Sequence, residues 1–433
     1  MAPIKKAFLM LYVTVLCASC NLINPADLPP LIATNTPLPP TVTPLPTFTP
    51  TPIPERYTVE GFENFIAEVE ATDRTQRQGL VNQFIIGAPQ IPVVTDSYTI
   101  FLWQGTPDSV HLIGDMNNWQ PDNPLPLTRL FNTDLWYRIE PYESDARLDY
   151  KYLIDGEQDI LDPVNPDLVQ SGFGRRSVLT MPSYVTPEEL LPTANEIPAG
   201  SLSTETVTSQ ALGQTRTLFI YTPAQPPKGE SGKYPSVYIH DGSDYLNFID
   251  ATEILDRLIA DGRIPPLVAV FLPPIDRRVE YLRNDAYVQF MADEAVPFVQ
   301  ANYNTSTSPA DTGSLGASMG GLISVYAALN RPEVFGLVGS QSGALAYGGD
   351  GVIRQVQLMP AAEVRFHLTI GSYETQIAGT GPEANFVTAN ERFAAELQAK
   401  EYDFVHEVRP QGHSWGFWQA TLGETLIWLY GTP

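Results

Sequence analysis

The chain has 433 residues, of which 43% are hydrophobic and 17% charged, so it is long enough for two or three domains with real cores. Its formal net charge of −24 at pH 7 argues against nucleic acid and against anionic lipid as partners. Both cysteines, Cys17 and Cys20, lie near the N-terminus, so the body of the chain contains no disulfide and no thiol nucleophile.

The N-terminus has the features of an export signal. Two lysines precede an apolar run at 7–16, which is too short to span a bilayer permanently. The Cys-Ala-Ser-Cys that follows resembles a bacterial lipobox, with Cys20 as the lipidated first residue after a signal peptide at 1–19. Cys17 departs from the leucine usual at its position. We therefore expect an exported, cell-surface lipoprotein anchored to the bacterial membrane, with an ordinary secretory signal or an uncleaved anchor as alternatives.

Residues 20–56 form a predicted tether. Eleven prolines and seven threonines occur between Pro25 and Pro54, a composition that cannot form a core. An extended polyproline-like chain of that length reaches roughly 90 Å at about 3.1 Å per residue. It would hold the globular part away from the membrane.

Residues 57–92 are predicted to be helical, because Phe62, Phe65, Ile66 and Val69 recur at helical spacing. From residue 93 to 183 the pattern changes to short strands with turn signals about every ten residues, which predicts a β-sandwich. The expected strands include 98–103, one within 110–119 that runs into a turn, 135–139 and 148–156.

The 93–183 segment carries V-x-L-x-G-D-x-N-x-W at Val110–Trp119 and D-Y-K-Y-x-I-D-G at Asp149–Gly156. These motifs resemble the early-set immunoglobulin-like modules that precede glycogen-branching and debranching enzymes, and related sandwiches precede enterochelin-esterase-like domains. Some such modules bind glucans through stacked tryptophans. The resemblance makes Trp119 and Trp136 candidates for carbohydrate binding, while a place in the sandwich core is the alternative.

Residues 184–433 alternate strands and helices, which predicts an α/β fold with a mostly parallel sheet. The expected strands lie at 215–222, 234–240, 267–272, 311–315, 334–340, 364–370 and 403–409. The expected helices lie at 248–261, 287–303, 322–329, 384–400 and 415–430.

The sequence Gly316-Ala317-Ser318-Met319-Gly320-Gly321 has the form G-x-S-x-G, in which a serine occupies a tight strand-to-helix turn. A buried strand precedes it and a helical pattern follows it, as this nucleophile elbow requires. Ser318 is therefore the candidate nucleophile, provided that an acid and a base are found.

In an α/β-hydrolase the acid and then the histidine follow the serine along the chain. His367 and His406 lie inside strand-like runs, whereas His413 lies in the loop after the last strand, where a base can reach the serine. Glu374 lies just past the end of the 364–370 strand and is the candidate acid. Asp403 is its competitor, although it opens the last strand at the wrong end.

An oxyanion hole needs two backbone N–H groups aimed at the developing negative oxygen. One is expected from Met319, directly after the nucleophile, and the other from Gly242 or Ser243 in the loop after the second buried strand. No residues have metal-ligand spacing, and no phosphate loop or dinucleotide fingerprint is present, so we predict neither a metal nor a cofactor.

Residues 200–433 resemble the putative-esterase family of α/β-hydrolases, which includes enterochelin esterases, feruloyl and acetylxylan esterases, and mycolyltransferases. The matching segments are Tyr238–Gly242, Gly316–Gly321, Gly371–Glu374 and Gly412–Trp418. Gln411 stands where the family usually has the first glycine before Gly-His. The resemblance implies a cofactor-free serine esterase of the carboxylic-ester hydrolase class, with the enterochelin-esterase-like branch the best match because it also carries the sandwich.

The expected function is thus hydrolysis of a small-molecule or polysaccharide-linked ester through an acyl-enzyme and a Ser-Glu-His triad. Two alternatives remain: a carbohydrate-binding surface lipoprotein with a degenerate hydrolase domain, and an acyltransferase that uses the same triad. The sequence does not distinguish among siderophore, feruloyl, acetyl and simple acyl esters.

Overall fold

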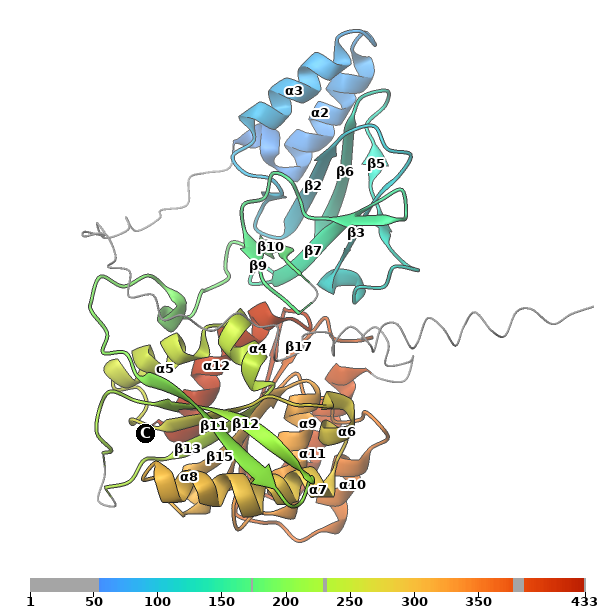
Figure 1. Ribbon diagram of the computed structural model, residues 1–433. Helices are drawn as coiled ribbons and strands as arrows, with labels where there is room; N and C mark the ends of the chain where they lie inside the picture. Colours follow the sequence, from blue (N-terminus) through green and yellow to red (C-terminus); the bar gives the residue numbers. More distant parts are fainter. Residues whose placement is uncertain (1–53, 173, 229–231, 377–384, 432–433) are drawn as a thin grey trace, which may run out of the picture.

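The computed structural model describes residues 54–172, 174–228, 232–376 and 385–431 (Figure 1). Cys20, the predicted signal peptide and nearly all of the predicted tether lie outside the described residues, so export and lipidation stay predictions. Within the described ranges, no helix combines the length and apolar character needed to cross a membrane.

A helical pair opens the described chain. After a 3-10 turn at Glu55–Tyr57, helices α2 (Val59–Ala71) and α3 (Arg77–Gly87) follow. The segment predicted to be helical thus contains two helices, and the Asp73 carboxylate between them accepts hydrogen bonds from the backbone N–H and the hydroxyl of Thr75, at 2.9 and 2.6 Å. Such an Asx turn competes with helical hydrogen bonding and ends α2.

The next unit consists of two antiparallel sheets. One has the strand order β1-β2-β6-β5, and the other has the order β4-β3-β7-β10-β9, with β8 paired to β7. The strands are β1 (Val93–Val94), β2 (Tyr98–Gln104), β3 (Val110–Gly114), β4 (Leu125–Pro126), β5 (Thr128–Arg129), β6 (Leu135–Pro141), β7 (Arg147–Ile154), β8 (Gln158–Ile160), β9 (Leu168–Val169) and β10 (Arg176–Thr180).

The two sheets pack face to face and form the predicted sandwich. Phe101 of β2 and Trp136 of β6 share a buried cluster with Leu112, Tyr150 and Leu179 of the other sheet. On its other face the first sheet is covered by α2 and α3, whose buried aromatic side chains join the cluster around Ile100 and Leu102 (Figure 1).

The C-terminal unit is built on an eight-stranded sheet with the order β11-β12-β14-β13-β15-β16-β17-β18. From β14 to β18 all neighbours are parallel, while β11 and β12 form an antiparallel edge. The strands are β11 (Ser201–Ser209), β12 (Gln214–Thr222), β13 (Ser236–His240), β14 (Val268–Leu272), β15 (Thr312–Ala317), β16 (Leu337–Gln341), β17 (Arg365–Gly371) and β18 (Asp403–Arg409). The predicted parallel α/β fold is confirmed; β11 was not predicted, because its outer face is polar and exposed.

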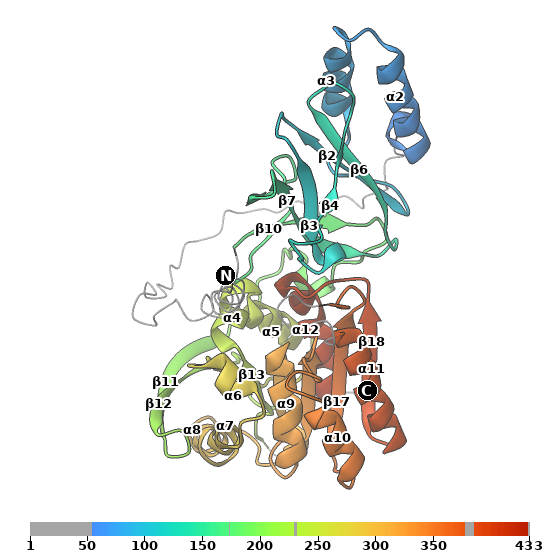
Figure 2. The same ribbon diagram turned by 90° about the vertical axis from the view of Figure 1, so that its right-hand side faces the viewer.

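Helices cover both faces of this sheet (Figure 2). A buried hydrophobic cluster lies on each face of the sheet. One packs the sheet against α5 and α12, and the other packs it against α9, α10 and α11. The helices of this unit are α4 (Gly242–Phe248), α5 (Ala251–Ala260), α6 (Arg277–Tyr281), α7 (Asp285–Gln289), α8 (Val296–Asn302), α9 (Met319–Asn330), α10 (Gly351–Leu358), α11 (Phe386–Ala399) and α12 (Trp415–Tyr430). Three short 3-10 turns lie elsewhere in the described chain: Asp115–Asn117 after β3 of the sandwich, Glu188–Leu190 before β11, and Pro309–Asp311 before β15. The helix expected at 287–303 is interrupted by a π-helical turn at Phe290–Ala295, between α7 and α8.

Two buried polar groups in the core of this unit, Arg216 and His240, have well-defined partners. Arg216 of β12 makes two hydrogen bonds to Glu280 of α6, at 2.8 and 2.9 Å. His240 at the end of β13 contacts the Tyr287 hydroxyl through Nδ1 and the Ser314 hydroxyl through Nε2, at 3.2 and 3.1 Å. Burial lowers the pKa of His240 to about 3, so its ring stays neutral at physiological pH.

Candidate active site

The turn that carries the candidate nucleophile, Ser318, lies between β15 and α9. Ser318 has φ 57° and ψ −117°, a strained conformation for a residue with a side chain, and α9 begins at the next residue. The turn depends on glycine, since a Cβ on Gly316 would lie 2.6 Å from the carbonyl carbon of Gly320. This is the geometry of a nucleophile elbow, at the carboxyl end of a central parallel strand.

His413 lies in the loop between β18 and α12, and its Nε2 is 3.0 Å from the Ser318 Oγ. The rings of Phe386 and Trp418 contact the imidazole edge to face, with centroids 5.3 and 5.0 Å away. These two aromatic side chains fix the ring plane, so Nε2 is directed at the serine.

Glu374, in the turn after β17, orients the histidine from the other side. Its Oε2 lies 2.6 Å from His413 Nδ1. Its Oε1 accepts hydrogen bonds from the Gly371 N–H at 2.8 Å and the Ser342 hydroxyl at 2.7 Å. The carboxylate is fully buried, which means that its orientation is determined by these three partners.

The competing acid, Asp403, is excluded by its position. It is the first residue of β18, at the amino ends of the parallel strands, whereas Ser318 lies at their carboxyl ends. Its side chain is 65% exposed and pairs with Arg365. The structure therefore brings together the three predicted residues Ser318, Glu374 and His413.

Sequence reasoning missed the residues that hold this acid. Ser342 follows β16 with φ 52°, and its hydroxyl also accepts a hydrogen bond from Trp418 Nε1 at 2.8 Å. The neighbouring Gln341 donates to the Trp418 carbonyl at 2.7 Å and accepts from the Tyr245 hydroxyl at 2.6 Å. Their place directly after a parallel strand was a usable signal, because ligand-contacting residues of open α/β sheets gather at that edge.

The candidate oxyanion amides belong to two neighbouring strand ends. β13 and β15 are parallel, with Ile239 beside Leu315, so the segment that starts α4 lies alongside the segment that contains Ser318. Among the described residues, no hydrogen bond uses the backbone N–H of Met319, Gly242 or Ser243. All three amides therefore stay candidates for the oxyanion hole.

The charges beside this turn are balanced. Arg277 donates to both carboxylate oxygens of Asp241, at 2.8 and 2.9 Å, and its guanidinium lies 3.4 Å from the Ala317 carbonyl. Burial, together with the Asp241 charge, raises the pKa of Asp244 in the first turn of α4 to about 7. A pKa near 7 leaves Asp244 partly protonated at neutral pH, which reduces the opposing charge near a developing oxyanion.

One further cluster has metal-ligand residue types. His367, Glu407 and Glu424 bring ligand atoms within 4.8 Å of one another. Arg409 pairs with both carboxylates, and its Nη2 lies 3.0 Å from Glu424. The Arg409 guanidinium already pairs with both carboxylates and offsets one negative charge, so these residues do not fit a resident cation well.

The two candidate carbohydrate-binding tryptophans have different surroundings. Trp136 is only 7% exposed and packs in the sandwich core, with its Nε1 3.2 Å from the Gly105 carbonyl, so it offers no face for a sugar. Trp119 is half-buried, and the Arg176 guanidinium stacks 3.9 Å from the centre of its ring. The sugar-binding expectation is thus reduced to the uncovered part of Trp119.

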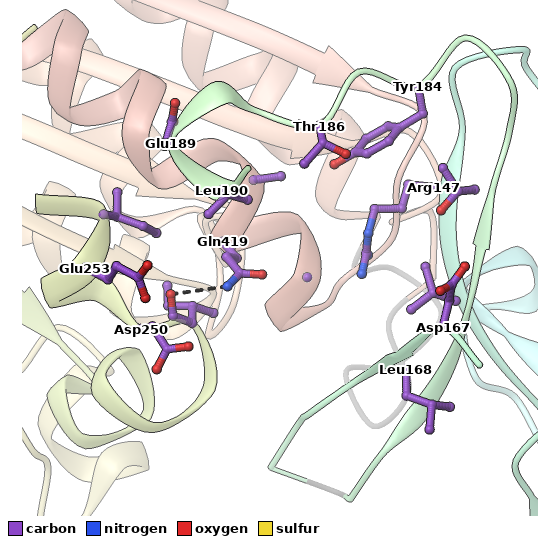
Figure 3. A pocket seen from close by; sticks show the side chains of 16 residues that line it. Arg147, Asp167, Leu168, Tyr184, Thr186, Glu189, Leu190, Asp250, Glu253 and Gln419 are labelled. Atoms are coloured by element: carbon purple, nitrogen blue, oxygen red, sulfur yellow. Dashed lines mark hydrogen bonds between the residues drawn. The ribbon is translucent and has the colours of Figure 1, made fainter. Parts of the chain in front are cut away.

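A pocket of about 420 Å³ lies between the sandwich and the C-terminal unit (Figure 3). Arg147, Tyr184 and Thr186 line one side, and Asp250, Glu253 and Gln419 line the other. None of the three triad candidates lines it, so this pocket is separate from the catalytic geometry.

Comparison with known proteins identifies the family. The esterase family model, described as "Putative esterase", matches residues 209–429, about half of the chain. The chain belongs to this esterase family. It is 30% identical over 161 residues to the uncharacterized protein YbbA of Bacillus subtilis, which covers 34% of this chain and 64% of YbbA, slightly less than two thirds of that relative.

The similarity of this esterase to enterobactin esterases extends over both domains. It is 27% identical over 360 residues to the iron(III) enterobactin esterase of Escherichia coli K12, covering 74% of this chain and 86% of that protein. The crystal structure of the enterobactin esterase FES from Shigella flexneri superposes with a TM-score of 0.64 at 23% identity, covering 77% of this chain and 94% of that one. The crystal structure of the ferric enterobactin esterase from Salmonella typhimurium superposes with a TM-score of 0.65 at 21% identity, covering 77% of this chain and 93% of that one. The structural likeness establishes the α/β-hydrolase-type fold.

Proposed function

We propose that this esterase hydrolyses carboxylic esters through an acyl-enzyme formed on Ser318, with His413 as general base and Glu374 as the residue that orients it. The observation that carries the proposal is the chain of contacts from Ser318 Oγ to His413 Nε2 at 3.0 Å and from His413 Nδ1 to Glu374 at 2.6 Å, on a serine with φ 57°.

In the first half-reaction Ser318 Oγ attacks the ester carbonyl carbon while His413 Nε2 takes the hydroxyl proton. The carbonyl oxygen becomes negative and accepts hydrogen bonds from the Met319 amide and from the amide of Gly242 or Ser243. The tetrahedral intermediate then collapses, and His413 returns the proton to the departing alcohol, leaving an acyl ester on Ser318.

In the second half-reaction a water molecule gives a proton to His413 and attacks the acyl ester. The carboxylic acid leaves, and the proton returns to Ser318. Glu374 keeps the Nδ1–H tautomer throughout and stabilises the imidazolium that forms in each half-reaction. No metal or cofactor takes part in these steps.

The substrate class that we propose first is a siderophore ester, because relatives named as enterobactin esterases align with most of this chain, sandwich included. Feruloylated or acetylated polysaccharides and simple acyl esters are the other members of a test panel. Transfer of the acyl group to a sugar or lipid would appear in the same panel as a product other than free acid.

The test of the catalytic assignment is Ser318→Ala, assayed by release of p-nitrophenol from p-nitrophenyl acetate. Activity should fall to background. Ser324→Ala is the matched control, because its hydroxyl lies in the same helix and bonds only the Gly320 carbonyl among the described residues. Retained activity in Ser318→Ala would refute the proposal, whereas loss in both variants would indicate damage to α9.

We also propose that the enzyme works outside the cell as a lipoprotein anchored through Cys20, on the strength of the N-terminal sequence pattern alone. Metabolic labelling with a radioactive fatty acid should mark the wild-type chain and not the Cys20→Ala variant. Equal labelling of both, or of neither, would refute the anchor.

A further inference from the structure

The sandwich contacts the loop that carries the candidate acid on both sides of Glu374. The Tyr373 hydroxyl donates to Glu143 Oε2 at 2.6 Å. Two residues later, Asn118 Nδ2 donates to the Thr375 hydroxyl at 3.2 Å, and the Gln376 N–H donates to Asn118 Oδ1 at 3.1 Å. Between these contacts the Glu374 side chain points inward, to His413.

The sandwich also contacts the loop that carries the candidate base. The backbone N–H of Arg147, the first residue of β7, donates to the Pro410 carbonyl at 3.2 Å. This contact pairs Arg147 with Gln411 in a single parallel β-bridge. The next residue, Gly412, lies against Asp115: a Cβ there would be 2.2 Å from the Asp115 carboxyl carbon. His413 follows directly.

Asp115 is itself rigidly held. It is fully buried, its Oδ1 accepts from Trp119 Nε1 at 2.8 Å, and its Oδ2 accepts from the Asp149 N–H at 2.7 Å. Burial and the nearby Asp149 charge raise the pKa of Asp115, and Arg147 balances Asp149 at 3.1 Å. Because the Asp115 side chain is held by these two hydrogen bonds, it limits how far the Gly412 backbone can move toward the sandwich.

We propose that the sandwich domain fixes the position of the loop that carries Glu374 relative to the loop that carries His413. Asn118 and Glu143 are the positioning residues for the first loop, through Thr375 and Tyr373. Asp115 is the positioning residue for the second, through Gly412. The inference rests on the proposed triad. It assigns to the sandwich a role in the turnover of every ester, including those too small to touch it.

The expected size of the effect follows from the triad's geometry. His413 must stay within hydrogen-bonding distance of two partners carried by different loops, at 3.0 and 2.6 Å. A displacement of about 1 Å in such an arrangement costs up to about a hundredfold in rate. The remaining contacts between the two loops, such as the Tyr373 N–H to the Gln411 carbonyl at 3.2 Å, limit the loss.

The test combines Asn118→Gly with Tyr373→Phe. Asn118 has φ 54°, which glycine adopts without strain, so the first change removes only side-chain contacts. The second removes one hydroxyl. With p-nitrophenyl acetate, kcat should fall roughly tenfold or more while KM changes less than about twofold, because positioning affects the transition state rather than binding of a small ester. Lys151→Gln, which breaks an exposed ion pair to Asp159 within the sandwich, is the matched control and should leave both constants unchanged.

A second readout separates this proposal from the triad itself. The rate at which a fluorophosphonate labels Ser318 should fall in the double variant in proportion to kcat, with an unchanged melting temperature. Equal labelling rates and equal kcat in wild type and double variant would overturn the positioning role and leave the triad intact. No labelling of Ser318 in the wild type would instead overturn the triad.

Gly412→Ala approaches the same contact from the hydrolase side and covers the case in which the double variant does not fold. Its Cβ would meet Asp115, so the base loop must shift, and kcat should again fall with KM nearly unchanged. Wild-type kcat in folded Gly412→Ala would refute the proposal.

Discussion

The Glu374→Gln variant should lose activity through the wrong histidine tautomer rather than through loss of structure. Oε1 of Glu374 accepts from the Gly371 N–H at 2.8 Å, and a backbone N–H can only donate. The glutamine must therefore keep its oxygen at that position, and its NH₂ group faces His413 Nδ1.

An NH₂ group at 2.6 Å from Nδ1 requires Nδ1 to accept, which moves the ring proton to Nε2. The Nε2 lone pair is then no longer available to take the Ser318 proton. The analogous tautomer error in a serine protease triad costs about 10⁴-fold in kcat, and we expect a loss of similar order here, which corresponds to about 5 kcal/mol of transition-state stabilisation.

The assay is steady-state hydrolysis of p-nitrophenyl acetate, together with thermal unfolding. Shape and volume are conserved, so the melting temperature should stay within a few degrees of the wild-type value. Glu363→Gln, an exposed site before β17, is the matched control and should leave kcat unchanged. A folded Glu374→Gln protein with kcat within tenfold of wild type would refute the reasoning.

Three further predictions concern buried polar groups. Ser342→Ala removes the partner of the Trp418 indole N–H and one of the partners of Glu374 Oε1. Urea unfolding should show a free energy of unfolding lower by about 2–4 kcal/mol, and kcat should fall, whereas unchanged stability would contradict these hydrogen bonds. Glu280→Ala leaves the buried Arg216 guanidinium unpaired and should cost about 3–5 kcal/mol in the same experiment, whereas a cost below 1 kcal/mol would mean that the pair is solvated. His240 titrates near 6.5 when unfolded and near 3 when folded, so the folded protein should lose up to roughly 5 kcal/mol as the pH falls from 6.5 to 3; His240→Gln should flatten this pH dependence, and an unchanged slope would refute the buried neutral ring.

The candidate triad could be predicted because each member follows a strand in a recognisable local pattern. Ser318 lies in a glycine-flanked turn that few other sequences adopt, and the order of acid and histidine along the chain then left few choices. Parallel strands place their carboxyl ends at one edge, so residues far apart in the sequence were expected to meet there. The distances among Ser318, Glu374 and His413 agree with that expectation.

What could not be predicted depends on contacts between distant segments. Ser342 reaches Glu374 only because β16 and β17 are neighbours with a particular register, and that register is set by packing rather than by local pattern. The contact of Asp115 with Gly412 joins two domains, and neither residue has a neighbour in sequence that indicates the other. The break between α2 and α3 depended on one Asx turn at Asp73, which hydrophobic periodicity does not detect.

The most direct test of the proposed mechanism is to trap the acyl-enzyme. The purified protein would be mixed with a slowly hydrolysed p-nitrophenyl ester, quenched in acid and analysed by intact and peptide mass spectrometry. The proposal predicts one acyl group per chain, located on Ser318, with accumulation abolished in Ser318→Ala and strongly slowed in Glu374→Gln. An acyl group on a different residue, or turnover without any trapped adduct on Ser318 at saturating ester, would contradict it.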